Sequence, residues 1–287
     1  MSDEMNEIHI KQATLWLQEA DSIVIGAGAG MGVDSGLPDF RGSEGFWKAY
    51  PALKGYSFID MANPQWFVTD PQKAWGFYGH RLNLYRTTQP HLGFEILRQW
   101  TEKKRDDYFI FTSNVDGQFQ KAGFDDQKVA ECHGSIHYVQ SLTGEGGIYT
   151  ASGIEVTVDE ERIQAALPLP THPHLSGTLR PNILMFGDAG WDPERTDAQE
   201  HRYHTWWRAQ KKRRVLIIEM GAGTSIPSVR YNSERILHYC PHAKLIRINP
   251  REAQVPIQFK DRSIPFYAGA LATLTAIDTY YRAALED

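Results

Sequence analysis

The sequence predicts an α/β fold, a doubly wound parallel sheet with a smaller inserted subdomain. Apolar segments typical of buried strands alternate with amphipathic segments along the 287 residues, which is the pattern of a parallel sheet covered by helices on both faces. Glycine-rich or polar segments follow five predicted strands, at 26–36, 113–117, 187–188, 221–225 and 249–250. Ligands of open α/β sheets bind at the carboxyl ends of the strands, so these segments mark the predicted ligand site.

The first half of the chain supplies helices and strands in alternation. Apolar residues at helical spacing predict a helix over 6–20, and the β-branched run after it predicts a buried strand at 22–26. The aromatic-rich segment 43–85 contains several prolines and predicts a small helical subdomain, whose clearest helix covers 72–86. The same periodicities predict a helix at 91–102, a strand at 108–112, a short helix at 118–123 and a strand at 128–131.

The second half begins with a module of different composition. Glycines and prolines between 136 and 178 predict an insertion with little helix and a β-rich piece around 154–158. The pattern of the main sheet resumes at 181–188. A helix at 193–210, a strand at 214–220, a helix at 228–239, a strand at 244–248 and a helix at 269–284 complete the chain.

Composition argues against several kinds of partner. The net charge is −5, so no general basic field recruits nucleic acid or an anionic membrane. The basic block Lys211–Arg214 joins a helix to a strand and is interpreted as a solvated connection. No apolar leader follows the acidic N-terminus, and no apolar run approaches the ~18 residues of a membrane span. Cys132 and Cys240 form no disulfide framework. We therefore expect a cytoplasmic protein.

The stretch 23–42 is the strongest single indication of a ligand. A predicted strand leads into glycines at four alternate positions, Gly26 to Gly32, which lets backbone N–H groups approach a pyrophosphate. The dinucleotide pattern G-x-G-x-x-G fails because Met31 or Val33 stands at its third glycine. The rigid turn 38–41 adds an acid, an aromatic ring and a guanidinium. These features together predict a nucleotide site, and a tight strand-to-helix turn is the alternative for the glycines alone.

Blocks of this sequence resemble the sirtuin family, in the family's order. GAGMG at 28–32 and GLPDFRG at 36–42 resemble the sirtuin NAD loop. The other blocks are TSNVDG at 112–117, ECHG at 131–134, LRPNILMFGD at 179–188, GTS at 223–225 and INP at 248–250. The resemblance spans residues 26–250 and implies NAD as the cofactor. We accordingly expect a Rossmann-like NAD-binding domain made of 1–45, 86–135 and 179–287, with 46–85 and 136–178 as a small subdomain inserted in two pieces.

Three residues are the predicted catalytic set. Cleavage of a nicotinamide–ribose bond needs a held ribose, a held carboxamide and a base for a ribose hydroxyl. His133 is the candidate base, because imidazole titrates near neutrality and this residue follows a strand on the ligand edge. By resemblance it deprotonates the cofactor ribose after nicotinamide leaves, Asn114 orients the ribose and a water, and Asp116 holds the carboxamide. The alternatives are a structural histidine and an Asx-turn after the strand.

The resemblance implies further cofactor-binding residues. Phe40 would shield the reacting sugar and Arg41 would help to hold the phosphates, and a surface ion pair of Asp39 with Arg41 is the alternative. A helix cap also explains Ser225, and a strand-end turn explains Asn249. Besides the catalytic three, the set is Gly28, Ala29, Gly30, Gly32, Asp39, Phe40, Arg41, Ser113, Gly223, Thr224, Ser225 and Asn249.

The implied substrate is an acyl-lysine protein or peptide, which would add as a strand near Phe186, Gly187 and Asp188. Tyr78 and Arg81 match the Tyr-x-x-Arg pattern of sirtuins that accept succinyl- or malonyl-lysine. Residues three apart share a helix face, so a phenol and a guanidinium can grip one carboxylate. The alternative is an arginine whose stem covers core aromatic residues.

The sequence departs from the sirtuin pattern where most members bind zinc. The four positions expected to hold cysteines are Ser141, Gly144, His172 and Leu175. Without thiolates we predict no metal and a module held by its own packing. We interpret His137, His172 and His174 as exposed loop residues, and weak metal binding by these histidines is the alternative. Three replacements predict a remodelled pocket: Ser113 for glutamine, Gly32 for serine and Asp188 for glutamate.

The resemblance therefore implies an NAD-dependent protein-lysine deacylase, either a deacetylase or a desuccinylase or demalonylase, which moves the acyl group to ADP-ribose. A protein ADP-ribosyltransferase or NAD hydrolase on the same scaffold is one alternative, since these activities cleave the same bond. A non-catalytic NAD or ADP-ribose sensor is another. The presence of His133 beside Asn114 and Asp116 argues against a sensor. The sequence does not indicate the oligomeric state or the protein substrates.

Overall fold

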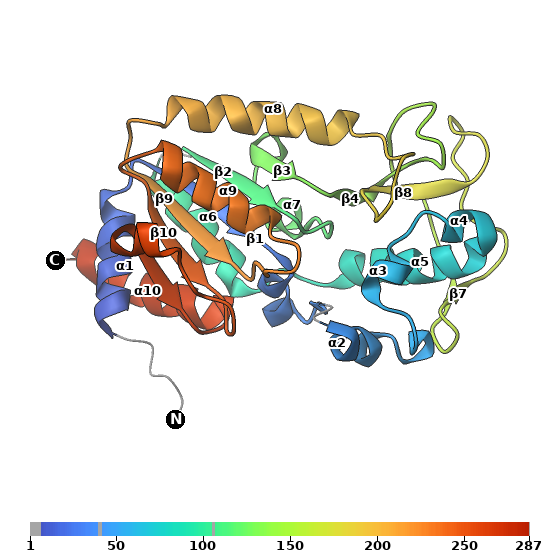
Figure 1. The fold of residues 1–287 in the computed structure, drawn as a ribbon, viewed down its shortest axis with the longest axis horizontal. Coiled ribbons are helices and arrows are strands. Elements are labelled where there is room, and N and C mark those ends of the chain that lie inside the picture. The colour runs from blue at the N-terminus through green and yellow to red at the C-terminus, as the bar shows by residue number, and fades with distance from the viewer. Residues whose placement is uncertain (1–6, 40–41, 105–106, 287) are drawn as a thin grey trace.

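A computed structural model describes residues 7–39, 42–104 and 107–286 of the chain. Its central feature is a six-stranded sheet in the order β11-β10-β9-β1-β2-β3, in which all neighbouring strands run parallel (Figure 1). The strands are β1 Ser22–Ala27, β2 Tyr108–Thr112, β3 Val129–Glu131, β9 Val215–Met220, β10 Lys244–Ile248 and β11 Ser263–Phe266. The predicted doubly wound α/β fold is confirmed, and β11 is a strand that the sequence pattern did not indicate.

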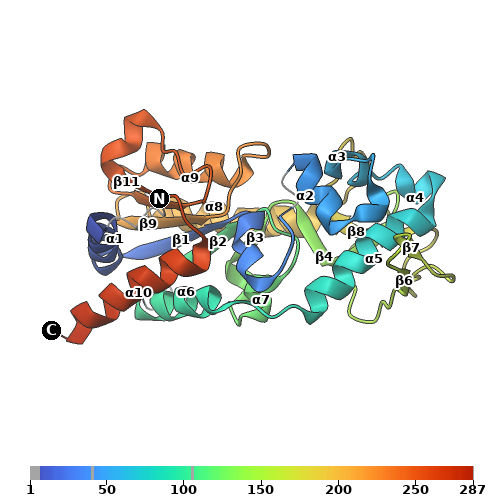
Figure 2. The same ribbon diagram turned by 90° about the horizontal axis from the view of Figure 1, so that it is seen from below.

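Helices cover both faces of this sheet because successive residues of each strand point to opposite sides. Ile23 and Ile25 of β1 pack with one helical layer, whereas Val24 packs with the other. The first layer contains α1 Glu7–Glu19, α6 Leu92–Lys103, α7 Gln118–Lys121 and α10 Ala270–Glu286, and the second contains α8 Glu194–Ala209 and α9 Ser228–Tyr239. Figure 2 shows the sheet between these two layers. The predicted helices are confirmed to within a few residues at their ends.

A second hydrophobic core lies in the smaller part of the molecule, at the right of Figure 1. Its helices are α2 Gly42–Ala49, α3 Phe58–Met61, α4 Trp66–Thr69 and α5 Pro71–Thr87. Its strands form an antiparallel sheet of β5 Tyr149–Thr150, β4 Gly134–Ser141 and β8 Leu179–Ile183, and a separate pair of β6 Val158–Asp159 with β7 Gln164–Ala165. Short 3-10 helices cover Ala29–Met31, Val33–Ser35, Pro51–Leu53, Asp126–Lys128 and Ile257–Arg262.

The position of β8 corrects one expectation. The sequence pattern placed 181–188 in the main sheet, but β8 pairs with β4 in the smaller antiparallel sheet. A short buried apolar run does not specify which sheet it joins, because it has the same composition in either. The predicted domain boundary between 178 and 179 stays a prediction.

Side chains of α5 hold the inserted module by its backbone. The hydrogen bonds run from Gln72 Nε2 to the Ala165 carbonyl (3.0 Å), from Trp75 Nε1 to Leu179 (2.9 Å), from Asn83 Nδ2 to Val156 (2.9 Å) and from Arg86 Nη1 to Ile154 (2.7 Å). Gly76 allows this close approach, because a Cβ there would lie only 2.2 Å from the Ile163 carbonyl oxygen. These hydrogen bonds fasten the module to α5.

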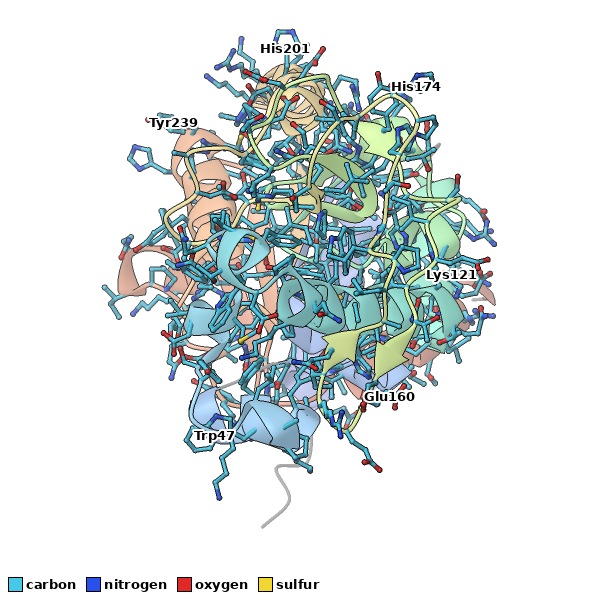
Figure 3. All side chains as sticks on the ribbon, turned by 90° about the vertical axis from the view of Figure 1, so that its right-hand side faces the viewer. Trp47, Lys121, Glu160, His174, His201 and Tyr239 are labelled. Carbon is cyan, nitrogen blue, oxygen red and sulfur yellow. The ribbon has the colours of Figure 1, made fainter. Side chains whose placement is uncertain are left out.

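Two histidines of the module lie together, since the ring centroids of His172 and His174 are 5.6 Å apart. The rings of His172 and His174 lie 4.6 and 5.3 Å from that of Tyr149, centroid to centroid, and Figure 3 shows His174 at the outer edge of the molecule. His137 instead turns inward, with its Nε2 at 2.8 Å from the carbonyl oxygen of Asp116. Within residues 7–39, 42–104 and 107–286, no three His, Cys, Asp or Glu side chains are gathered as a metal site requires.

The basic block before β9 is engaged in surface ion pairs. Arg213 pairs with Asp107, and Arg214 Nη2 lies 2.6 Å from Asp21 Oδ1. The side chain of Arg214 is 61% exposed, so this segment is a solvated connection that ties the start of β9 to its neighbours. In the part of the chain that the structure describes, no helix has the length and apolar character needed to cross a membrane.

Candidate active site

The glycine loop after β1 packs backbone against backbone. The Gly28 N–H donates to the Met220 carbonyl over 2.9 Å and the Gly30 N–H to the Gly221 carbonyl over 3.1 Å. A Cβ on Gly28 would lie 2.7 Å from the Gly221 oxygen, closer than real Cβ atoms come. The glycines therefore serve the approach of two loops. These two amides face the protein, which differs from the expectation that they face a pyrophosphate, while Ala29 between them is exposed.

The remainder of the loop is only partly described. Phe40 and Arg41 lie outside the described residues, and Asp39 is half-buried. At Gly32, a Cβ would lie 3.1 Å from Leu37 Cδ1. The serine of the sirtuin pattern would therefore require Leu37 to shift by a few tenths of an ångström, which gives a steric reason for glycine at this position.

His91 fixes the same loop from α6. It caps this helix, with Nδ1 accepting the Gly93 N–H over 3.0 Å, and its Nε2 lies 2.9 Å from the Met31 carbonyl oxygen. These two bonds together require the neutral ring with its proton on Nε2. Burial lowers the pKa of His91, against smaller opposing effects of the Met31 carbonyl and Asp34.

We expect the free energy of unfolding to fall as the pH is lowered through 6.5, in part because of His91. Its pKa in the folded protein lies below 6.5, so the unfolded chain binds the proton more readily. The stabilisation that neutral His91 provides is complete above pH 6.5 and is lost as the pH falls further. The loss amounts to about 1.4 kcal/mol for each unit by which folding lowers the pKa of His91. His91→Asn keeps a cap for α6 but does not titrate, so urea unfolding at pH 7 and pH 5 should show a smaller difference. Exposed His238→Asn is the control, and equal differences in the two variants would contradict this prediction.

Asn114 and Asp116 follow β2 at the carboxyl edge of the sheet. Asn114 Nδ2 donates to the Gly28 carbonyl over 3.1 Å, which ties this segment to the glycine loop. Asp116 is buried, and its Oδ1 accepts the Gln118 N–H over 2.9 Å, so the Asx-turn alternative describes its geometry. Burial, supported by the charge of Glu131 and opposed by the Gln118 N–H, raises the pKa of Asp116 to about 6. Its carboxylate is still mostly ionised at pH 7.

His133 lies between β3 and β4, one strand further along the same edge. Its carbonyl accepts the Leu184 N–H over 3.0 Å, and its Nε2 lies 3.3 Å from Oγ of Ser228 at the start of α9. Burial lowers the pKa of His133, and a hydrogen bond with the Ser113 backbone opposes this effect. The imidazole is therefore neutral at pH 7 and is able to accept a proton.

The loop 223–225 after β9 meets the loop after β10. The hydroxyl of Thr224 donates to the carboxylate of Glu252, while Ser225 is exposed. Pro227 is the N-cap of α9, so the cap alternative for Ser225 is wrong. Asn249 is buried, with Nδ2 donating to the Ala222 carbonyl over 2.9 Å and Oδ1 accepting two backbone N–H groups. The side chain of Asn249 thus forms the strand-end turn that was its alternative interpretation.

Asp188 lies beneath the predicted peptide-binding segment. Its carboxylate pairs with Arg180, both side chains being 0% exposed, and also accepts the Met185 and Gly190 N–H groups over 3.1 and 3.2 Å. Asp188 therefore shapes this loop from within, in contrast to the predicted contact with a peptide. Phe186 is half-buried, and Gly187 is exposed with a φ of +67°.

Tyr78 and Arg81 face each other on α5 within a buried aromatic cluster. The guanidinium carbon of Arg81 lies 5.6 Å from the ring centroid of Tyr78 and 5.3 Å from that of Phe77, and its Nε donates to the Tyr85 hydroxyl over 3.1 Å. Arg81 is only 6% exposed. Among the described residues, nothing hydrogen-bonds the buried hydroxyl of Tyr78. Burial raises the pKa of Tyr78 to about 12, so this hydroxyl keeps its proton and can donate.

The structure brings the predicted catalytic residues to one edge and adds two residues that sequence reasoning missed. Ser228 touches the candidate base, and Glu252 takes the hydroxyl of Thr224. Neither carries a sequence signal of its own, because each reaches the site from a loop or helix end by tertiary packing. A groove of about 350 Å³ runs beside Asp116 and is also lined by His137 and Arg195.

The chain is similar to known proteins over most of its length. The model of the Sir2 family matches residues 28–224. An NAD-dependent protein deacylase of Leptospira interrogans is 29% identical over 228 residues, 79% of this chain and 80% of that protein. One of Aquifex aeolicus is 28% identical over 252 residues, 84% of this chain and 90% of that protein. A solved Sir2 homologue–NAD complex, at 22% identity and a TM-score of 0.70, covers 96% of this chain and 94% of its own and shows the same fold.

Proposed function

This chain belongs to the Sir2 family, and on that basis we propose that it is an NAD-dependent protein-lysine deacylase. The observation that carries the assignment is the meeting of His133, Asn114 and Asp116 at the carboxyl edge of the parallel sheet, beside the glycine loop. A neutral base, a buried carboxylate and an anchored amide are the groups that cleavage of a nicotinamide–ribose bond needs.

The donor set fits NAD. Asp116, which stays mostly ionised at pH 7, would accept from the carboxamide N–H of nicotinamide. The exposed Ala29, Thr224 and Ser225 lie on loops at the ends of β1 and β9, where a dinucleotide binds in open α/β sheets. Close packing of the glycine loop on Gly221 brings the loops after β1 and β9 into backbone contact.

The proposed chemistry assigns one task to each catalytic residue. NAD supplies an electrophilic ribose carbon and nicotinamide as the leaving group, and the acyl oxygen of the lysine substrate attacks that carbon. Asn114, held by the Gly28 carbonyl, orients the ribose. His133 takes the proton of a ribose hydroxyl at Nε2, which promotes transfer of the acyl group to the sugar. Water then releases the deacylated lysine side chain of the substrate and an O-acyl-ADP-ribose.

Mass spectrometry of the products tests this function. The protein is incubated with NAD and acyl-lysine peptides, and we expect deacylated peptide, nicotinamide and O-acyl-ADP-ribose in equal amounts. ADP-ribose attached to protein would indicate a transferase, and free ADP-ribose with intact peptide an NAD hydrolase. If NAD binds and is not consumed, the chain is a sensor and the proposal is wrong.

We propose further that the acyl group carries a carboxylate. Arg81 supplies a buried positive charge, and the buried hydroxyl of Tyr78 beside it has a donor to offer. Burial of a charged acyl chain is favourable only where a cation and a hydrogen-bond donor pair with its carboxylate. Succinyl- and malonyl-lysine meet this requirement, whereas acetyl-lysine does not. The peptide backbone would lie along Phe186 and Gly187, above Asp188.

Replacing Arg81 with methionine should reverse the acyl preference. The variant fills a similar volume without charge, so kcat/KM for a succinyl-lysine peptide should fall by about 10²-fold, the order expected for a lost buried charge–carboxylate bond, while that for acetyl-lysine changes by less than about threefold. Competition assays with both peptides measure the ratio. Lys73→Met on the same helix, a residue that lies over the Trp66 ring, is the control. An unchanged ratio in Arg81→Met would overturn the acyl assignment.

The location and domain division complete the proposal. Cys132 and Cys240 are free thiols, which suits the reducing cytoplasm. Residues 1–45, 86–135 and 179–287 form the NAD-binding domain in this proposal, and 46–85 with 136–178 form the small subdomain.

A further inference from the structure

A serine that the proposed function does not use touches the candidate base. Ser228 is the first residue of α9, and its Oγ lies 3.3 Å from Nε2 of His133. The helix is firmly seated, because buried Val229 packs on Gly26 of β1, where a Cβ would come within 3.1 Å of Val229 Cγ1. Ser228 therefore reaches the imidazole from a rigid element, which is what fixes the direction of a catalytic ring.

The charged groups around His133 are engaged elsewhere. Glu131, two residues before it, pairs with Arg195, and Asp116 on the neighbouring strand end accepts the Gln118 N–H. The Cys132 thiol is neutral, because burial raises its pKa. Burial lowers the pKa of His133, and the hydrogen bond with the Ser113 backbone opposes this effect. Among the residues that the structure describes, the imidazole thus has a hydroxyl, and no counter-ion, beside the nitrogen that reacts.

A hydroxyl suits both protonation states of that nitrogen. The Ser228 O–H can donate to the lone pair of neutral Nε2, and after proton transfer its oxygen can accept from Nε2–H. The second bond is about twice as strong as the first, because it involves a charged donor. Because Glu131 and Asp116 are engaged elsewhere, this bond favours the imidazolium form in the buried site.

We propose that Ser228 is a positioning residue for His133. It keeps Nε2 directed into the site and stabilises the imidazolium that forms when the ribose hydroxyl loses its proton. The Ser228 O–H first releases the Nε2 lone pair, the proton then moves from the ribose oxygen to Nε2, and the Ser228 oxygen accepts from the new Nε2–H while keeping its own proton. This inference rests on the proposed deacylase function, and it assigns a role in the reaction to the start of α9.

Titration of His133 in the free protein tests the contact without any activity. Nitrogen-15 NMR of the imidazole gives the pKa in wild type, Ser228→Ala, Ser228→Thr and Ser233→Ala. Ser233 is the matched control, because it is a buried serine of α9 whose hydroxyl bonds only within the helix, to the Val229 carbonyl. We expect Ser228→Ala to lower the pKa of His133 by about half to one unit, and the threonine and control variants to keep it. An unchanged pKa in Ser228→Ala would overturn the proposal.

Kinetics then link the contact to the reaction. In Ser228→Ala, kcat for deacylation should fall by about tenfold and the acid limb of kcat/KM should move to lower pH, while threonine restores both. Exchange of labelled nicotinamide into NAD in the presence of peptide should change by less than about twofold, because it precedes the base step. Wild-type kcat and pH profile in Ser228→Ala would overturn the role. If wild-type protein shows neither exchange nor deacylation, the deacylase function fails, and the NMR titration still decides whether Ser228 tunes the imidazole.

Discussion

Replacing His133 with glutamine should lower kcat for deacylation by about 10²- to 10⁴-fold, the usual contribution of a general base. Glutamine can still form a hydrogen bond with Ser228, so the local packing persists, but an amide does not accept the ribose proton. The neutral imidazole is ready for that proton at pH 7, since burial lowers its pKa. Quantitative mass spectrometry of O-acyl-ADP-ribose under saturating NAD and peptide measures the loss.

The same variant should retain nicotinamide exchange, because bond cleavage comes before the step that needs the base. Cys132→Ala is the matched control, since it changes the adjacent side chain at the same strand end and leaves the ring in place. A His133→Gln enzyme with more than about a tenth of the wild-type kcat would show that another group acts as the base.

Elements whose evidence is local could be predicted from the sequence. The apolar runs of β1 and β2 and the amphipathic pattern of α6 each contain their own signal, and the structure places them within a residue or two of the prediction. Strand β11 was not predicted, because it has four residues, includes Pro265 and lies at the edge of the sheet. Proline is tolerated at such an edge, so its presence removed the sequence signal without removing the strand.

The same distinction between local evidence and tertiary packing applies to the candidate site. The sequence predicts His133, Asn114 and Asp116 at one edge, because parallel strands end on the same side of a sheet. Partners that come from tertiary packing were not predictable in this way. Asp188 reads as an exposed loop acid until Arg180 is seen to lie against it in the core. Ser228 likewise resembles an ordinary start of a helix until α9 is seen to pack over β1 and β9, which brings Ser228 to His133.

Replacing Arg247 with methionine should destabilise the protein by about 3–5 kcal/mol, the cost of leaving a buried carboxylate without its partner. Arg247 on β10 lies directly beside Glu219 on β9, with Nε at 2.6 Å from Oε1 and both side chains 1% exposed. Its Nη2 also lies 3.0 Å from Glu234 Oε1, and its Nη1 donates to the Gln254 carbonyl over 2.7 Å. Urea unfolding, compared with wild type at pH 7, measures the loss.

The double variant Glu219→Leu with Arg247→Met separates two consequences of this change. The double variant no longer buries an unpaired Glu219 carboxylate. Its free energy of unfolding should therefore return to within about 1–2 kcal/mol of wild type, because apolar residues often replace a buried ion pair at little cost. The bond from Arg247 to the Gln254 carbonyl remains lost in both variants, which leaves that carbonyl with the bond from Arg230 Nη2 over 3.0 Å. Because Gln254 belongs to the loop that carries Glu252 opposite Thr224, weaker NAD binding should persist in the double variant even after stability recovers. Calorimetric titration with NAD distinguishes the outcomes. If the double variant recovers both NAD affinity and stability, Arg247 acts on the fold alone. If it recovers stability but not affinity, Arg247 also holds the loop that carries Glu252 in place.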